Sequence, residues 1–78
     1  MHSAWASFLG MVEELSNDVK GYREAANLTQ IGLAERMGVS RKTVNTVENG
    51  IFAPSIVVAL KFARALGVPV ETLFQLRD

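Results

Sequence analysis

The chain has 78 residues, of which 49% are hydrophobic, and its eight basic and eight acidic side chains cancel. It contains no cysteine, and its single histidine is His2, so a disulfide framework, a thiolate metal site and a histidine-based catalytic pair are excluded. The length predicts one small domain with a modest core, and the lack of cysteine favours a cytoplasmic protein.

Residues 1–16 form an apolar segment that precedes the main domain at 17–78. Hydrophobic side chains recur there at spacings of four and three, at Met1, Trp5, Phe8, Val12 and Leu15. This spacing predicts an additional N-terminal amphipathic helix. The segment lacks the basic start and the cleavage site of a signal peptide and is too short to span a bilayer. Three fates remain open: packing on its own domain, contact with a second copy, or a leader preceding a start at Met11.

The rest of the chain predicts an all-α fold, because a period of 3.6 recurs and no long alternation appears. After good N-cap residues at Ser16 and Asn17 we expect a helix from about Asp18 to Ala26. Thr29 predicts the start of a helix over residues 30–37, and Gly38 predicts its left-handed end.

Ser40 predicts the start of the next helix, which runs from about Arg41 to Asn49. Pro54-Ser55 opens a longer helix that ends at Gly67, with Ile56, Ala59, Leu60 and Ala63 expected to face inward. Pro69 fits the first turn of a last short helix that carries Val70, Leu73, Phe74 and Leu76. The prediction is a compact bundle of about five short helices in addition to the N-terminal one.

The two helices on either side of Gly38 and Ser40 form a helix-turn-helix pattern. Val39, Val44 and Val47 are expected to face the core, which leaves Arg41, Lys42, Thr43, Asn45 and Thr46 outside. An α-helix fits the DNA major groove, where Arg can pair with guanine, Asn with adenine, and a threonine methyl can meet thymine. An ordinary solvated helix face is the alternative.

Four motifs carry a specific resemblance: T-Q-x-x-L-A, G-V-S-R-x-T-V, E-N-G, and P-S followed by A-L-G-V. With these motifs, residues 17–76 resemble the Cro/cI (Xre-type) helix-turn-helix family of transcriptional regulators. The resemblance implies a lambda-repressor-like bundle that binds double-stranded DNA. We expect no enzymatic activity, because no base is available to activate a nucleophile, and no cofactor.

The resemblance also implies roles for individual residues. Gln30 matches a glutamine that bonds a DNA phosphate, and Asn49 matches a position that contacts the sugar-phosphate chain. Positions used for bases and phosphates are occupied by Ser40, Arg41, Lys42, Thr43, Asn45 and Thr46. Arg23 and Glu48 match a structural salt bridge beneath the motif.

The chain departs from the family pattern at two places. Ile51-Phe52-Ala53 stands where the family usually has a basic or polar residue, and Ile31-Gly32 replaces the usual acidic pair. Fewer cations predict a shallower salt dependence of DNA binding. Ile51 and Phe52 are expected to pack on the core or, as the alternative, on a second chain.

The leading hypothesis is a small sequence-specific DNA-binding regulator that acts as a homodimeric repressor at an operator. Dimer contacts are expected from the N-terminal segment or from Val70, Leu73, Phe74 and Leu76, although a core role is equally open for both. An antitoxin with a toxin partner, or a restriction-modification controller, is the second hypothesis. The third is a protein-interaction module that has lost its DNA affinity, which the neutral charge and the apolar residues 51–53 favour. No membrane partner is expected.

Overall fold

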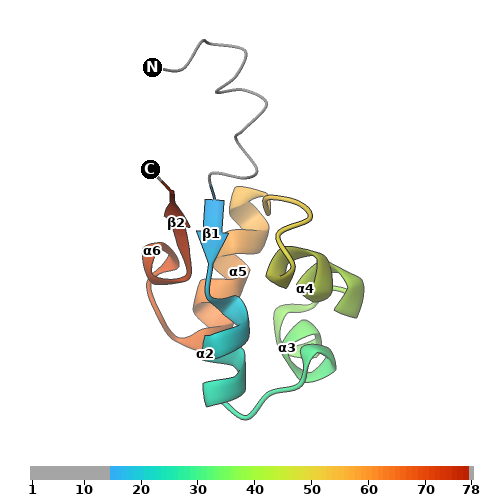
Figure 1. Cartoon of the computed structure of the whole chain (residues 1–78). Coiled ribbons are helices and arrows are strands. Elements are labelled where there is room, and N and C mark those ends of the chain that lie inside the picture. The colour runs from blue at the N-terminus through green and yellow to red at the C-terminus, as the bar shows by residue number, and fades with distance from the viewer. Residues whose placement is uncertain (1–14, 78) are drawn as a thin grey trace, which may run out of the picture.

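The computed structural model of the protein describes residues 15–77, and most of the predicted N-terminal helix lies outside them. The described elements follow in the order β1 (Leu15–Asn17), α2 (Val19–Ala25), α3 (Gln30–Met37), α4 (Arg41–Glu48), α5 (Ile56–Leu66), α6 (Val70–Leu73) and β2 (Phe74–Leu76). Figure 1 shows α3 and α4 side by side, with the pair formed by β1 and β2 on the other side of the molecule and α5 behind β1. The predicted bundle of short helices is therefore confirmed.

Local capping signals start and end the helices of the motif. Thr29 Oγ1 accepts a hydrogen bond from the Gly32 amide at 2.9 Å, and Ser40 Oγ accepts one from the Thr43 amide at 3.2 Å. Gly38 closes α3 in the left-handed region at φ 73°. The predicted bounds of residues 30–37 are confirmed, and α4 ends at Glu48, one residue earlier than predicted.

A two-stranded antiparallel sheet corrects the all-α prediction. Leu15 pairs with Leu76, Ser16 with Gln75 and Asn17 with Phe74. Leu15 therefore lies in a strand and not in the predicted N-terminal helix. Phe74 and Leu76, predicted in the last helix, lie in the second strand. Each strand spans only three residues. An alternating pattern cannot be recognised over three residues. The pairing also joins segments from opposite ends of the sequence, so no local signal predicts it.

The core gathers around Phe62, which is fully buried with Leu33, Leu73, Val19 and Val44. Burial of each such side chain is worth about 1.5–3 kcal/mol. The Phe62 ring meets the Phe74 ring edge to face, with centroids 6.0 Å apart. This contact fastens α5 to the C-terminal strand.

The face that α5 presents to this core differs from the prediction. Ile56 and Leu60, predicted to face inward, are 78% and 53% exposed, whereas Phe62, which was not predicted, is buried. The predicted burial of Ala63 is confirmed. Within α5 only Lys61 and Arg64 are charged, so the hydrophobic pattern does not define one face. Phe62, the largest side chain of the helix, decides which face is buried. None of the helices described between residues 15 and 77 is long and apolar enough to cross a bilayer.

Candidate nucleic-acid interface

The helix-turn-helix unit is held rigid at the turn between α3 and α4. The amides of Gly38 and Val39 donate to the carbonyls of Glu35 and Ala34 at 3.2 and 3.0 Å, which completes the end of α3. Val39 is partly buried and packs against the core. The direction of α4 is therefore fixed before its first turn begins.

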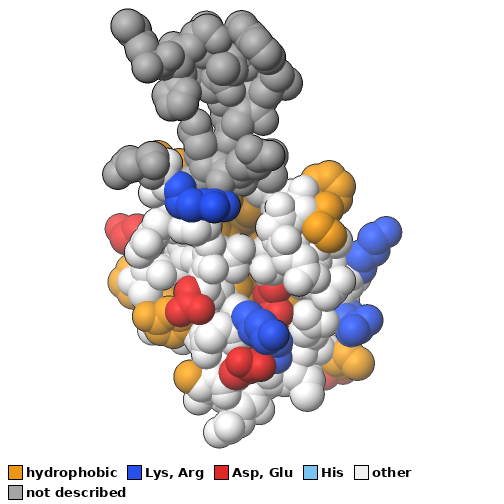
Figure 2. Space-filling model, viewed as in Figure 1, with side chains coloured by type: hydrophobic (Ala, Val, Ile, Leu, Met, Phe, Trp, Pro, Cys, Tyr) orange, Lys and Arg blue, Asp and Glu red, His pale blue; other side chains and the backbone are white. Residues whose placement is uncertain are grey.

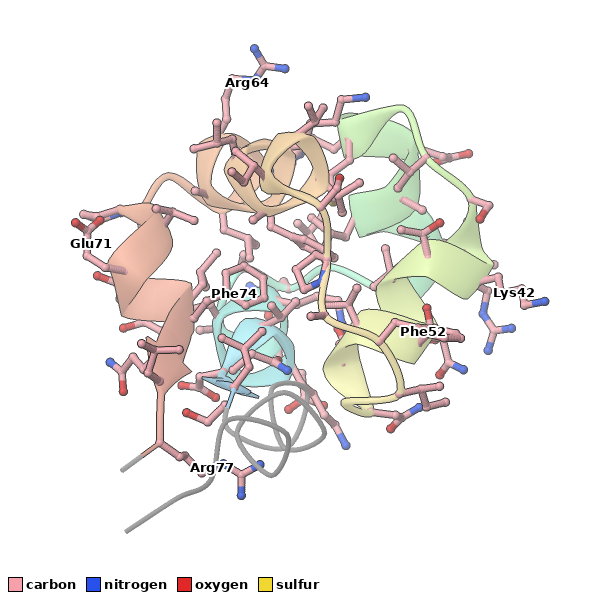
Figure 3. The ribbon with its side chains drawn as sticks, turned by 90° about the horizontal axis from the view of Figure 1, so that it is seen from above. Lys42, Phe52, Arg64, Glu71, Phe74 and Arg77 are labelled. Carbon is pink, nitrogen blue, oxygen red and sulfur yellow. The ribbon has the colours of Figure 1, made fainter. Side chains whose placement is uncertain are left out.

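The burial pattern of α4 separates an inner from an outer face. Val44 is 0% exposed and Val47 is 4% exposed, so both valines fasten the helix to the core. Arg41, Lys42 and Asn49 are exposed, and Thr43, Asn45 and Thr46 are half-buried. Figure 3 shows Lys42 projecting away from the body of the molecule. The first turn of α4 thus presents two cations to solvent.

An ion pair beneath α4 links it to α2. Arg23 Nε lies 2.6 Å from Glu48 Oε2, and the two side chains are only 10% and 3% exposed. Arg23 Nη2 donates to Glu48 Oε1 at 3.2 Å, and Nη1 donates to the Leu28 carbonyl at 2.9 Å. The hydrogen bond to Glu48 raises the pKa of Arg23 above its ordinary value, against the opposing effect of burial. The guanidinium therefore stays charged throughout the neutral pH range.

This ion pair continues as a hydrogen-bonded chain that reaches the outer face. Gln30 Nε2 donates to Glu48 Oε1 at 3.0 Å and to Asn45 Oδ1 at 3.3 Å. Asn49 Nδ2 donates to the same Asn45 oxygen at 3.1 Å. Three predicted DNA contacts, Gln30, Asn45 and Asn49, are thereby connected to the structural pair.

Several hydroxyl groups of α4 already have partners within the helix. Ser40 Oγ caps α4 and lies 3.0 Å from Thr43 Oγ1, and Thr46 Oγ1 donates to the Thr43 carbonyl at 3.2 Å. The structure thus places the predicted DNA-contacting residues on α4, at its two ends and at the start of α3, with Arg41 and Lys42 as exposed cations.

Asn17 supports this surface in a way that the sequence analysis missed. Its Oδ1 accepts from the Val19 amide at 3.1 Å, and its Nδ2 donates to the Val47 carbonyl at 3.0 Å. The side chain therefore joins the start of α2 to the end of α4. The sequence signalled only the first of these contacts, because an Asn before a helix indicates a cap.

The loop after α4 is apolar and solvent-exposed. Ile51 and Phe52 are 54% and 65% exposed, so the expectation that they pack on the core is wrong. Figure 2 shows apolar side chains gathered at the edge where this loop lies, and Figure 3 places Phe52 on the side of the molecule that carries Lys42. An apolar surface thus borders the cationic one.

Comparison with known proteins assigns the family. A helix-turn-helix family model matches residues 19–73, which include all five described helices. The chain belongs to the Cro/cI-type helix-turn-helix family. A helix-turn-helix transcriptional regulator of Methanocaldococcus jannaschii is 42% identical over 64 residues, covering 82% of this chain and 97% of the relative. YgzD, another such regulator from Bacillus subtilis, is 36% identical over the same shares.

A solved structure of a family member supports the same assignment. The restriction-modification controller protein C.AhdI from Aeromonas hydrophila is 35% identical and superposes with a TM-score of 0.66. The match covers 69% of this chain and 82% of the controller. The fold and the helix-turn-helix unit of this chain are thus those of DNA-binding regulators.

Proposed function

We propose that this chain is a sequence-specific repressor that binds double-stranded operator DNA with α4 in the major groove. The observation that carries the proposal is the arrangement of α4: its first turn exposes Arg41 and Lys42 while Val44 and Val47 are buried beneath. The N-terminal residues of such a helix reach the base edges. By occupying the operator the protein would exclude polymerase.

The phosphate contact proposed for Gln30 involves the start of α3. Both hydrogens of its side-chain amide are directed to Glu48 and Asn45. The backbone N–H groups of the first helical turn have no carbonyl partner within the helix and suit an anion. A phosphate at this position would therefore accept hydrogen bonds from the backbone N–H groups. The Gln30 side chain would contribute indirectly, because its bonds to Glu48 and Asn45 hold the start of α3 against α4.

Selection of bound duplexes from a random pool tests the proposal. We expect the full chain to enrich one sequence and Arg41→Ala to lose the preference at one base position, because a bidentate contact discriminates by about 1–3 kcal/mol. Arg64→Ala is the matched control, since Arg64 is an exposed cation of α5 that points to another side of the molecule (Figure 3). Equal loss of affinity by Arg41→Ala on selected and random duplexes would contradict base reading. Failure to enrich any duplex at low salt would favour the interaction-module hypothesis.

The homodimer remains part of the proposal, and the N-terminal candidate interface, which lies mostly outside the described residues, stays a prediction. Leu73 is buried, and Val70 and Phe74 pack against the core, so of the C-terminal candidates only Leu76 is largely exposed. The alternative surface consists of Ile56, Val57 and Leu60, which share one side of α5 by their spacing, and of Phe52 in the loop that precedes this helix. We name these four residues the α5 apolar surface.

The size of the α5 apolar surface favours a second copy as its occupant. Its members are 53–78% exposed and offer on the order of 500 Å² of apolar area, which is within the range of the largest apolar patch of a typical monomer, and such patches are often functional. A symmetric contact doubles this area, which with its polar rim approaches the roughly 1,200 Å² of a specific interface. No charged residue occurs between Glu48 and Lys61 to oppose such a contact. Phe52 lies in the loop that follows α4, so a two-fold axis near this residue would present both recognition helices to one side of a duplex.

A restriction-modification controller is the second candidate function, favoured by the likeness to C.AhdI. The DNA chemistry is the same, and only the regulated gene differs. A restriction endonuclease or methyltransferase gene beside this one would support the controller, whereas a toxin gene and a co-purifying toxin would support the antitoxin. Binding of the chain to the region upstream of its own gene measures the regulatory target directly.

A further inference from the structure

The side-chain oxygen of Asn45 is fully engaged inside the protein. It accepts from Gln30 Nε2 at 3.3 Å and from Asn49 Nδ2 at 3.1 Å. An amide oxygen has two lone pairs, and these two donors use both of them. Asn45 therefore has no acceptor left for a ligand while these bonds stand.

The orientation of the Asn45 amide follows from the ion pair beneath it. Both carboxyl oxygens of Glu48 accept hydrogen bonds from the guanidinium of Arg23, so Glu48 is an acceptor in this network. Gln30 must turn its amide nitrogen toward Glu48, and the second hydrogen of that nitrogen points to Asn45. If Asn45 turned its own nitrogen inward, two NH₂ groups would face each other. The oxygen of Asn45 is therefore inward and its nitrogen outward.

The outward nitrogen of Asn45 is accessible. Asn45 Nδ2 donates no hydrogen bond to any residue between 15 and 77. In the same described part of the chain, no buried side-chain nitrogen or oxygen lacks a partner. Asn45 Nδ2 therefore reaches solvent. Its helix neighbours one turn away are Arg41 and Asn49, on the face proposed to enter the groove.

We propose that Asn45 contacts DNA as a hydrogen-bond donor only, binding an acceptor group and not reading adenine. The pairing of Asn with adenine needs the amide oxygen to accept from N6 while the nitrogen donates to N7. Guanine presents two acceptors, O6 and N7, whereas adenine presents one acceptor, N7, beside the N6 donor, which a donor-only amide cannot pair. Thymine O4 and the phosphate oxygens are single acceptors. This inference rests on the proposed binding of α4 to duplex DNA and corrects the adenine contact expected from the residue type.

Duplex selection with the full chain and with Asn45→Ala tests the inference. If Asn45 lies over a base, we expect the wild type to prefer guanine by about fivefold or more at one position, and the variant to lose that preference. If Asn45 meets a phosphate, the variant will weaken binding to every duplex alike. A methylphosphonate at one backbone position of the selected duplex will then reproduce the loss.

Three outcomes would overturn the inference alone: adenine selected at the position that depends on Asn45, unchanged affinity of Asn45→Ala, or unchanged affinity of Asn45→Asp. Asn45→Asp retains an oxygen for Gln30 and Asn49 to bond and replaces the outward donor by an acceptor. Its thermal unfolding, followed by circular dichroism, reports whether the fold is kept. Absence of any enriched duplex for the wild type would instead overturn the proposed function, and this inference with it.

Gln30→Ala gives an independent readout. It removes one of the two donors to Asn45 Oδ1 and so frees a lone pair for adenine N6. At a base contacted by Asn45 we expect the preference to move from guanine toward adenine, whatever the overall loss of affinity. The Gln30→Ala chain must be folded and still select duplexes. If its guanine preference is then unchanged, the internal bonds to Asn45 do not determine which base it binds.

Discussion

Arg23 and Glu48 form a nearly dry ion pair beneath the recognition helix, and its contribution can be measured. Removing one partner of a buried pair leaves the other charge without compensation and costs about 3–5 kcal/mol. We expect Arg23→Ala to lower the free energy of unfolding by this amount in urea titration. The double variant Arg23→Met/Glu48→Leu should lose less than the single one, because it removes both charges. A loss below about 1 kcal/mol for Arg23→Ala would contradict a buried, mutually dependent pair.

Ser40 lies at the boundary between a structural and a DNA-binding role. Its hydroxyl accepts from the Thr43 amide, so Ser40→Ala should destabilise the fold by about 1 kcal/mol. Ser40→Asp retains a cap acceptor and should keep the stability while weakening DNA binding through its charge. Thermal unfolding and binding anisotropy measured on the same two variants separate these roles. Wild-type stability of Ser40→Ala would show that the cap contributes nothing.

At the scale of single elements, two glycines should respond oppositely to alanine. Gly21 lies within α2, and the atoms nearest to a Cβ there belong to the side chain of Asp18, which is exposed, makes no cap bond and would have to rotate away. Gly21→Ala should therefore stabilise the domain by about 0.5–1 kcal/mol. Gly38 ends α3 at φ 73°, where a Cβ is strained, so Gly38→Ala should cost about 1–2 kcal/mol. Chemical denaturation measures the free energy of unfolding of both variants. A change of the same sign for the two would contradict this assignment of backbone geometry.

The elements that the sequence could predict are those with local signals. The bounds of α3 and α4 follow from capping residues that lie directly beside these helices, namely Thr29, Gly38 and Ser40. The valines of α4 identify its buried face. The two strands could not be predicted in this way. Their pairing joins Leu15 to Leu76, and neither three-residue segment has a period of its own.

Two features could be determined only from the three-dimensional structure: which face of α5 is buried, and which way the side-chain amide of Asn45 is turned. The nearly uniform hydrophobicity of α5 allows several buried faces, and the face that carries Phe62 is the one packed into the core. Asn45 is recognisable from sequence as a polar outward residue. The exclusion of adenine, however, depends on bonds from Gln30 and Asn49, which a pattern of residue types does not contain.

For the whole molecule, the α5 apolar surface predicts the assembly. We expect the chain to be a dimer at micromolar concentrations and Leu60→Glu to make it monomeric, because a charge would be buried in the contact. Ile31→Glu is the matched control, since Ile31 is 56% exposed on α3, and it should remain a dimer. Sedimentation equilibrium measures both. A dimer that survives Leu60→Glu but dissociates with Leu76→Glu would place the interface at the C-terminal strand instead.

The charge of the whole molecule predicts a weak response to salt. The outer face of α4 offers Arg41 and Lys42, and the loop that follows it is apolar instead of basic. A dimer that neutralises about two phosphates per chain should show a slope of about −4 in log affinity against log salt. Titrations at several salt concentrations measure this slope. A value near −8 would mean that cations outside α4 also contact the backbone.

The most direct test of the account is an NMR titration of the ¹⁵N-labelled full chain with a duplex selected from the random pool. If α4 enters the major groove, the largest amide shifts will fall at the first turn of α3 and at residues 40–49, and α6 will change little. If duplex binds while the amide signals of residues 40–49 do not shift, the central claim that α4 contacts the DNA bases is contradicted.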